Sequence, residues 1–394
     1  MKVLVLGAGL MGTAAVEHLI NSGVEVAVAD KSARALSLCA DRVKSPDLET
    51  FQIDVTDHDA LVKLLKGGGF DVVVNALPYY LIVSALKAEM EAGINVVDME
   101  FESEQMSLKN KAAEAGITVV PGCGVAPGLS NMLVGYAANH LDRVERVKIF
   151  VGGLPQRPVP PLEYRVLFNL EGLWLEYTSK ARIVVNGKVE EVDALSGLEL
   201  IEFPGVGKLE AFYTDGLASL IYTFKENEKM ANVKEMFEKT LRYPGHANKI
   251  KTLIECGLLD IEPLEFEGVK IVPRKFLTTL LGSKLKLKDE KDMTVMRVKV
   301  IGDCGFKRYT FDLLDHYDES HKVTSMARTT AYTASIVAQL IGQGKIDDKG
   351  IIPPEELGAR IDIFKLILED LSKYEIKVKS VYTEISSSFS PMPS

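Results

Sequence analysis

The sequence predicts an α/β protein in two parts, a doubly wound parallel sheet followed by a second α+β domain with an antiparallel or mixed sheet. Over the first 120 residues, short apolar strands alternate with amphipathic helices, the pattern of a parallel sheet covered on both faces. After Pro121 this alternation stops, and a hairpin signal and paired strands follow. We therefore place the first domain at residues 1–124, completed by C-terminal helices within 323–394, and the second domain at residues 125–322.

A glycine-rich turn lies at the start of the chain. An apolar strand at residues 2–6 runs into Gly7-Ala8-Gly9-Leu10-Met11-Gly12, and a helical pattern follows to about residue 20. A strand, a G-x-G-x-x-G turn and a helix in this order are the fingerprint of a dinucleotide-binding Rossmann domain. Gly7 permits the tight turn, Gly9 lets the backbone approach a pyrophosphate, and Gly12 lets the helix pack closely on the strand. The N–H groups at the helix start, at Leu10 and Met11, are then expected to hold the phosphates.

An acidic residue stands where this fingerprint requires one. The second strand, residues 24–29, ends at Asp30, eighteen residues after Gly12. A carboxylate there accepts hydrogen bonds from both ribose hydroxyls of the adenosine and repels a 2′-phosphate, so it favours NAD over NADP. Lys31 and Arg34 weaken this preference, because a basic side chain can accommodate that phosphate.

The other elements of the first domain follow from apolar runs and helix stop signals. Gly67-Gly68-Gly69 ends one helix, and Gly93 and Gly116 are the expected C-caps of two more. The further strands are expected at residues 49–55, 71–75, 94–98 and 117–120, and the helices between them at residues 57–66, 79–92 and 104–115. Six strands complete a doubly wound nucleotide-binding sheet.

The second domain begins with a glycine-rich crossing at residues 122–128 and an apolar helix at 129–140. Asn186-Gly187 stands between two alternating runs, residues 181–185 and 188–192, and predicts a β-hairpin. A second strand pair is expected at 295–301 and 309–314. Helices are expected at 323–339, packing back on the first domain, and at 364–373, ahead of a Ser- and Pro-rich tail from Ser387.

Composition excludes several classes of function. The net charge is −9 and there is no basic cluster, so we expect no binding of nucleic acid. No apolar stretch approaches the roughly 18 residues of a membrane helix, and a strand starting at residue 2 leaves no room for a signal peptide. The four cysteines and six histidines are dispersed without metal-ligand spacing, so we expect no catalytic metal and a cytoplasmic protein with free thiols.

Ligands of open parallel sheets lie beyond the carboxyl ends of the strands, and this rule nominates residues by position. Asp54 and Val55 close the third strand and could flank the adenine. Asn75-Ala76-Leu77 closes the fourth strand, where the nicotinamide ribose is expected. Asp98, with Glu100 after it, closes the fifth strand on the nicotinamide side. A helix cap or loop acid explains Asp98 equally well, and turn chemistry explains Asp54 better.

A third group of polar residues lies in the second domain. The segment Thr240-Leu241-Arg242-Tyr243-Pro244-Gly245-His246 places an arginine, a tyrosine and a histidine beside a Pro-Gly turn, which predicts a loop. An arginine can bind a carboxylate through two parallel hydrogen bonds. The alternative is a surface turn with charged ends.

This segment closely resembles a characteristic stretch of the saccharopine dehydrogenase-like family. Four further stretches look like motifs of that family: Gly124-Val125-Ala126-Pro127-Gly128-Leu129-Ser130-Asn131, Tyr213-Thr214-Asp215-Gly216-Leu217, residues 328–334 and residues 350–356. Within the family, the form of the crossing and the overall length are most similar to the lysine 6-dehydrogenase branch. Saccharopine-forming relatives tend to carry an Asn-Arg-Asp-Ser type stretch at residues 214–216, and the loss of that arginine favours a smaller substrate.

The resemblance implies the roles of the substrate-side residues. Arg242 would hold the α-carboxylate of an amino-acid substrate, with Tyr243 and His246 lining the pocket. Tyr213 and Thr214 would belong to a polar loop on the substrate side. Asp98, Glu100 and Asp215 would lie near the amine. The resemblance also leads us to expect a homodimer formed through the second domain.

The expected function is an NAD-dependent oxidation of an amino-acid amine, in particular of the ε-amine of L-lysine to allysine, with release of ammonia and NADH. The amine must be neutral before hydride leaves, and a histidine titrates near the working pH. We therefore expect His246 to accept the proton and Asp98 or Asp215 to orient the amine. One alternative is reduction of an imine, as in saccharopine or carboxynorspermidine formation. Another is a non-catalytic NAD-binding regulator.

Overall fold

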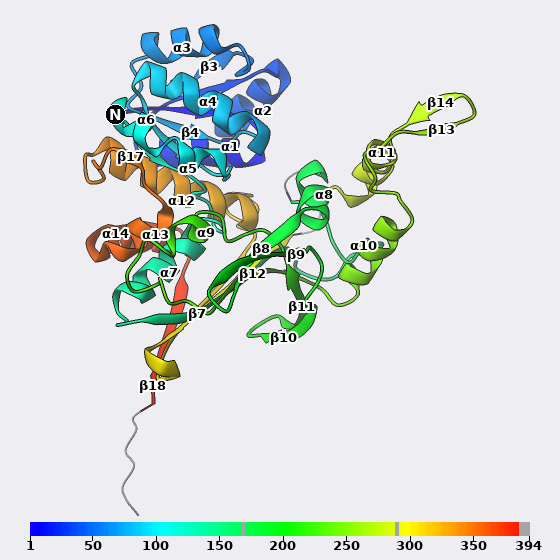
Figure 1. Ribbon diagram of the computed structural model, residues 1–394. Helices are drawn as coiled ribbons and strands as arrows, with labels where there is room; N and C mark the ends of the chain where they lie inside the picture. The colour runs from blue at the N-terminus through cyan, green and yellow to red at the C-terminus, as the bar shows by residue number, and fades with distance from the viewer. Residues whose placement is uncertain (168–169, 288–290, 386–394) are drawn as a thin grey trace, which may run out of the picture.

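The computed structural model describes residues 1–167, 170–287 and 291–385, so the predicted Ser- and Pro-rich tail from Ser387 lies outside the described residues. Two sheets organise the chain, a parallel one built mainly from the N-terminal residues and a mixed one built mainly from the centre of the sequence (Figure 1). The predicted fold class, a doubly wound parallel sheet with a second α+β domain, is confirmed.

The first sheet has seven parallel strands in the order β17-β6-β5-β4-β1-β2-β3. Its strands are β1 (Lys2–Leu6), β2 (Glu25–Asp30), β3 (Glu49–Gln52), β4 (Val72–Asn75), β5 (Asn95–Asp98), β6 (Thr118–Val120) and β17 (Gly350–Ile351). Its helices are α1 (Leu10–Asn21), α2 (Ala33–Val43), α3 (His58–Gly67), α4 (Tyr79–Ala92), α5 (Glu104–Ser107) and α6 (Lys109–Glu114). The six predicted strands form. The helix predicted at 104–115 is instead two short helices that meet at Leu108, and the seventh strand comes from far along the chain.

The second sheet has nine strands, of which seven follow the order β10-β11-β12-β7-β15-β16-β18, while β8 pairs with β12 and β9. The strands are β7 (Val144–Pro155), β8 (Lys180–Val185), β9 (Lys188–Asp193), β10 (Glu199–Phe203), β11 (Gly207–Tyr213), β12 (Glu235–Arg242), β15 (Asp292–Gly302), β16 (Lys307–His316) and β18 (Val378–Glu384). Strand β12 runs parallel to β7, whereas the other pairs are antiparallel, so the sheet is mixed. The predicted hairpin at Asn186-Gly187 is the β8–β9 pair, with positive φ at both turn residues, and β15 pairs with β16 as predicted.

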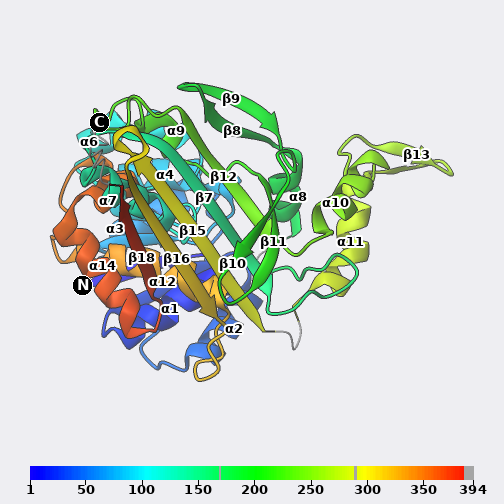
Figure 2. The same cartoon turned by 90° about the horizontal axis from the view of Figure 1, so that it is seen from below.

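The remaining elements cover the second sheet or project from it. They are α7 (Leu129–Asn139), α8 (Leu170–Thr178), α9 (Leu220–Thr223), α10 (His246–Glu255), β13 (Leu264–Phe266), β14 (Val269–Ile271), α11 (Pro273–Leu285), η1 (Asp303–Gly305), α12 (Ser325–Gly342), α13 (Pro354–Ala359) and α14 (Ile361–Lys373). Helices α10 and α11 and the β13–β14 hairpin form an arm that extends away from the body of the molecule (Figures 1 and 2). No helix within the described ranges is long and apolar enough to cross a membrane.

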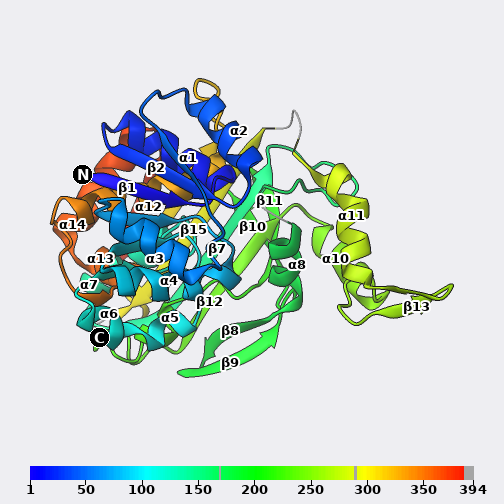
Figure 3. The same ribbon diagram turned by 90° about the horizontal axis from the view of Figure 1, so that it is seen from above.

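The C-terminal part of the chain joins both sheets. Helix α12 contacts α1, β4 and β5 of the first domain as well as β15 and β16 of the second, so it packs back on the nucleotide-binding domain as predicted. Figure 3 shows it beneath the helices of that domain. Strand β18 differs from the expectation that the C-terminal segment completes the first domain, because residues 378–384 pair with β16 at the edge of the second sheet.

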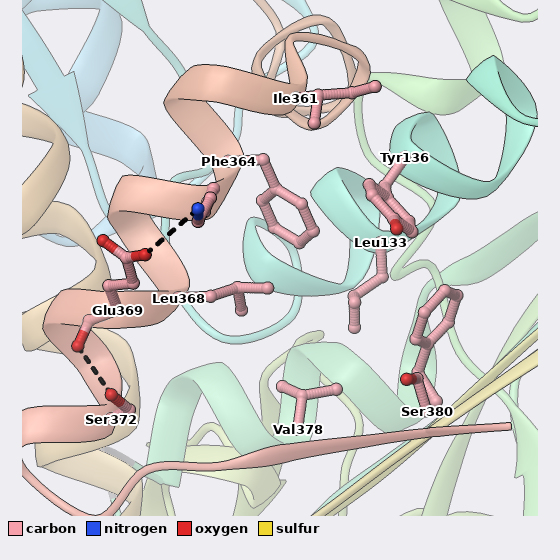
Figure 4. Close-up of a pocket in the computed structure, with 11 residues that line it drawn as sticks. Leu133, Tyr136, Ile361, Phe364, Leu368, Glu369, Ser372, Val378 and Ser380 are labelled. Carbon is pink, nitrogen blue, oxygen red and sulfur yellow. Dashed lines mark hydrogen bonds and ion pairs between the residues drawn. The ribbon is translucent and has the colours of Figure 1, made fainter.

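An apolar pocket lies where α7, α14, β16 and β18 meet (Figure 4). Its side chains include Leu133, Phe311, Phe364 and Leu368. None of its eleven lining residues belongs to the residues nominated from the sequence. The pocket is therefore a feature of the packing between helices and sheet, separate from the candidate site.

Candidate active site

The glycine turn has the geometry of a phosphate-binding loop. Gly7 has φ of 103°, and a Cβ there would lie 2.6 Å from the carbonyl oxygen of Ala76. A Cβ on Gly12 would lie 1.7 Å from the carbonyl oxygen of Gly7, whereas no heavy atom lies within 4 Å of the position of a Cβ on Gly9. The first and third glycines are thus required by close packing, and the second borders open space. No side chain of the described residues caps the N-terminus of α1, where Leu10 and Met11 stand. The residues present therefore fit a dinucleotide.

Asp30 lies against this turn at the end of β2. Its Oδ2 accepts a hydrogen bond from the Ala8 N–H at 2.8 Å, and its Oδ1 accepts one from the Ser32 N–H at 2.8 Å. These bonds fix the carboxylate beside the glycine turn with lone pairs left for ribose hydroxyls. Lys31 and Arg34 are exposed, and neither forms an ion pair within the described part of the chain.

The residues that follow β3 and β4, which the sequence nominated for cofactor binding, make contacts within the protein. Asp54 lies two residues beyond β3, and its Oδ1 accepts hydrogen bonds from the backbone and hydroxyl of Thr56, which is turn chemistry. Val55 and Leu77 are buried in the apolar core. Ala76 instead contributes the carbonyl that contacts Gly7.

Asp98 is enclosed in the first domain. Its side chain is fully buried, and its two oxygens accept hydrogen bonds of 2.5 Å each from Asn75 Nδ2 and Gln105 Nε2. Burial raises the pKa of Asp98 to about 7, and the nearby Glu89, which is also buried, has a pKa well above its ordinary value for the same reason. The Asp98 carboxyl is thus engaged with side chains of the first domain, and its orientation of the substrate amine stays a prediction.

Glu100 is placed differently, although it lies only two residues further on. The residue as a whole is exposed, but desolvation of its carboxyl group and the charge of Glu176 raise its pKa. Glu176 belongs to α8 of the second domain. Phe101 and Tyr222, whose ring centroids are 6.0 Å apart, meet in the same region. Glu100 thus has access to solvent at the point where the two domains face each other.

Arg242 is the last residue of β12. The sequence had instead predicted a loop at this position. It is 3% exposed. Its Nε donates to the hydroxyl of Tyr177 at 2.9 Å, Nη1 donates to the backbone carbonyl of Leu241 at 2.9 Å, and Nη2 donates to Glu176 Oε1 at 3.2 Å. The Tyr164 ring lies 4.7 Å from its guanidinium carbon. Nη2 also donates to Glu176 Oε2 at 3.5 Å, so one of the five N–H groups of the guanidinium, on Nη1, is left without a partner among the described residues.

The environment of His246 argues against the proton-acceptor role predicted from the sequence. It begins α10 and is fully buried. Its Nδ1 lies 2.6 Å from the Leu162 carbonyl, an acceptor only, so Nδ1 carries the hydrogen and Nε2 accepts one from the Tyr177 hydroxyl at 2.9 Å. Burial and the charge of Arg242 lower the pKa of His246 to about 3. The premise that it titrates near the working pH is therefore wrong, and His246 instead orients Tyr177 beneath Arg242.

The predicted pocket residues lie on two faces of the second sheet. Side chains alternate along a strand, so Glu238, Thr240 and Arg242 of β12 share one face. Tyr213 and Tyr243 pack with Phe237 and Leu241 in the apolar cluster on the other face, and the Tyr243 hydroxyl donates to the Pro155 carbonyl. Neither tyrosine lines a site with Arg242, in contrast to the expectation.

Two neighbouring residues of the loop after β11, Thr214 and Asp215, have different partners. Thr214 joins the face that carries Arg242, through hydrogen bonds with Glu238 and Thr240. Asp215 forms an ion pair with Arg182 of β8 at 2.8 Å, and Arg182 also donates to the Tyr222 hydroxyl. Asp215 is thus tied to a cation of the protein close to the point where Tyr222 meets Phe101.

Sequence reasoning missed several residues of this face, in particular Glu176, Glu238 and Thr240. Glu238-x-Thr240-x-Arg242 is an alternating polar pattern, which a strand assignment would have placed on one side. The Pro-Gly turn at 244–245 led instead to a loop for the whole segment. Glu176 on α8 carries no local signal, because only the tertiary fold brings that helix to β12.

The comparisons with known proteins match both domains. Residues 3–120 match the saccharopine dehydrogenase NADP binding domain, and residues 124–376 match the saccharopine dehydrogenase C-terminal domain. The chain belongs to the saccharopine dehydrogenase family. It is an oxidoreductase of that family with an NAD(P)-binding first domain.

Three curated relatives of the saccharopine dehydrogenase family are similar to this chain. Carboxyaminopropylagmatine dehydrogenase of Synechocystis is 27% identical over 90% of this chain and 92% of its own length. Carboxynorspermidine synthase of Vibrio alginolyticus is 23% identical, covering 91% and 92%. The L-glutamate-forming, NADP(+) saccharopine dehydrogenase of Saccharomyces cerevisiae is 28% identical over 73% of this chain, which spans 65% of the yeast protein. The apo structure of a yeast saccharopine dehydrogenase aligns with a TM-score of 0.77 at 21% identity, covering 97% of this chain and 99% of the other, which shows a shared fold.

Proposed function

We propose that this protein is an NAD-dependent dehydrogenase that oxidises an amino-acid amine, with the ε-amine of L-lysine as the substrate. The products would be allysine, ammonia and NADH. The bound nicotinamide supplies the hydride acceptor, and the protein supplies binding, orientation and charge.

The proposal rests on two acidic side chains, Glu100 and Glu176, that come from different domains. One carboxyl comes from the nicotinamide side of the first domain and the other from α8 of the second, and Glu176 raises the pKa of Glu100. Two carboxylates that repel each other favour a cation between them. An alkylammonium group is such a cation, and its position there would bring the ε-carbon to the carboxyl end of the parallel strands. The N–H group on Nη1 of Arg242 that has no partner among the described residues could bind the α-carboxylate.

The choice of NAD rests on Asp30, whose carboxylate is held beside the glycine turn. The yeast relative is named for NADP(+). Cofactor choice is thus a point on which this chain is expected to depart from that relative.

A second candidate is the reduction of an imine between an aldehyde and an amine. Two relatives that match along nearly their whole length are named for carboxyaminopropylagmatine and carboxynorspermidine, and not for lysine. A carboxylate-lined site would accept such amines as well.

A screen of NADH formation separates the candidates. L-Lysine, other free amino acids, saccharopine and polyamines are supplied singly with NAD or NADP, and absorbance of the reduced cofactor is followed. Lysine with NAD should give the highest kcat/KM. Turnover of carboxylated polyamines without turnover of lysine would favour the second candidate, and a protein that binds NAD but turns over none of these compounds would indicate a regulator.

We also propose that the chain forms a homodimer through the second domain and resides in the cytoplasm. The arm formed by α10, α11 and the hairpin exposes Phe266, Val269 and Phe276, which a partner subunit could cover. The four cysteines are all free thiols. Light scattering should give twice the mass of the chain, and fractionation of the source cells should recover the protein with the cytoplasm.

A further inference from the structure

A hydrogen-bonded chain of four side chains lies on the face of the second sheet that carries Arg242. Glu238 Oε2 lies 2.5 Å from the Thr214 hydroxyl, which lies 2.8 Å from the Thr240 hydroxyl. The Thr240 hydroxyl in turn lies 2.8 Å from Glu176 Oε1. A carboxyl group thus stands at each end, with two hydroxyl groups between them.

This chain requires one more proton than its hydroxyl groups provide. Its three hydrogen bonds need three hydrogens, and each threonine hydroxyl supplies one. An ionised carboxylate only accepts hydrogen bonds, so the third hydrogen must be the proton of a carboxylic acid at one end. If both carboxyls were ionised, both hydroxyl groups would donate outward and two bare oxygen lone pairs would face each other at 2.8 Å.

Glu238 is the end that holds this proton. The Glu176 carboxylate receives a charged hydrogen bond from Arg242 Nη2, which stabilises its ionised form. Glu238 forms no ion pair in the described parts of the chain, is 2% exposed, and its Oε1 has no hydrogen-bond partner there. Burial raises its pKa well above the ordinary value, and the charge of Glu176 adds to this effect. The direction of donation therefore runs from Glu238 through Thr214 and Thr240 to Glu176.

We propose that Glu176 is the proton acceptor for the substrate amine, and that the Thr214–Thr240 chain keeps the shared proton on Glu238 so that Glu176 stays ionised. This inference rests on the proposed amine oxidation. An N–H bond of the substrate ammonium breaks, an O–H bond forms on Glu176, and the nitrogen keeps the electron pair. That pair forms the C=N bond when the hydrogen of the ε-carbon leaves with its two electrons for the nicotinamide cofactor, which is reduced.

The position of Glu176 suits this role. Its side chain is 22% exposed, so that a substrate can reach it, and it acts on Glu100 across the domain boundary. Glu238 is enclosed, and Gly216 makes room for it, because a Cβ at residue 216 would lie 2.6 Å from Glu238 Oε2. The loop Thr214-Asp215-Gly216 thus supplies both the first hydroxyl of the chain and the space for its protonated end.

The first experiment reads the proton without turnover. Infrared spectra of the protein without substrate at neutral pH should contain a carbonyl stretch of a protonated carboxylic acid that Glu238→Gln removes and that Glu171→Gln leaves in place. Glu171 lies on the same helix as Glu176, is exposed and is not part of the chain, so it is the matched control. If Glu238→Gln leaves the carbonyl stretch of the protonated carboxylic acids unchanged, the assignment of the proton to Glu238 is wrong.

The second experiment follows lysine oxidation over pH. Glu176→Gln should lower kcat by about 100-fold, the usual contribution of a general base, and should abolish the acid limb of the kcat profile. The loss should be at least tenfold larger than in Glu238→Gln, since an amide can donate to Thr214 as the acid does. Thr240→Val should shift the acid limb, whereas Glu171→Gln should not. A Glu176→Gln enzyme with normal kcat and a normal acid limb would exclude Glu176 as the base. If the wild type does not oxidise lysine, the proposed function is wrong, and the infrared spectra alone decide where the proton lies.

Discussion

The proposed preference for NAD can be tested at one carboxylate. Asp30 is held at the end of β2 by hydrogen bonds from the backbone of Ala8 and Ser32, beside the position expected for the adenosine ribose. Asp30→Asn removes the negative charge and keeps the shape of the side chain. We expect the wild type to use NAD with at least tenfold higher kcat/KM than NADP, and the variant to lose most of this ratio.

The magnitude follows from Coulomb's law. A 2′-phosphate about 5 Å from the carboxylate is repelled by about 0.8 kcal/mol per unit charge in water and by about 3 kcal/mol at an effective dielectric constant of 20. Asp30 is partly exposed, which favours the lower part of this range. Because a tenfold ratio corresponds to about 1.4 kcal/mol, the charge of Asp30 is sufficient to produce it.

The assay measures kcat/KM for both cofactors at saturating substrate in wild type, Asp30→Asn and Asp54→Asn. Asp54 is the control, because it is another carboxylate at the same edge of the sheet whose oxygen is engaged with Thr56. A wild type that uses NAD and NADP equally would refute the reasoning and would assign the phosphate to Lys31 and Arg34. An equal change of the ratio in Asp54→Asn would show that the effect is not specific to the ribose position.

Three further variants test other parts of the structure. His246→Asn should lower kcat/KM through misplacement of Tyr177 and Arg242 but leave the acid limb of the pH profile in place, and a shifted limb would restore His246 as an acid–base group. Gly216→Ser should lower lysine oxidation at least tenfold while thermal unfolding shows a folded protein, because its Cβ would meet the Glu238 carboxyl at 2.6 Å; normal activity would contradict the tight fit. Glu89→Gln should raise the Tm more at pH 8 than at pH 4. The pKa of Glu89 is raised in the folded protein, so wild-type stability falls as pH rises above the ordinary carboxyl value of about 4, and an equal gain at both pH values would contradict this.

The first domain was predictable because its signals are local. Most of its strands are apolar runs, three of its helices end at glycine stop signals, and the glycine turn and Asp30 are fixed by spacing along the sequence. The parts that escaped prediction depend on distant contacts. Strand β17 contains only two residues and is defined by its pairing with β6, and β18 is mostly exposed at the edge of the second sheet.

The candidate site was less predictable, since the role of a titratable residue depends on its burial and its partners. Asp98 stands at a strand end, as the positional rule requires, but its side chain points to Asn75 and Gln105 within the protein. His246 has the chemical type of a general base, but the Leu162 carbonyl and the Tyr177 hydroxyl occupy both ring nitrogens. The residues next to Asp98 and His246 in the sequence do not indicate these hydrogen-bond partners.

The acid–base chemistry of this site depends on proton balance more than on residue type. A histidine with both nitrogens bonded inside the protein and a pKa lowered to about 3 is poorly suited to accept a proton near neutrality. A carboxylate with a cation beside it and a hydrogen-bond donor behind it stays ionised, and Glu176 has both in Arg242 and Thr240. In the proposed reaction, Glu176 takes a proton from the bound ammonium group while Arg242 stays beside it. Such a base is adequate because hydride transfer removes the neutral amine as it forms, and the iminium product cannot recapture the proton without a lone pair. The proposal therefore allows the site to bind the ammonium form of the amine and still react through the neutral form.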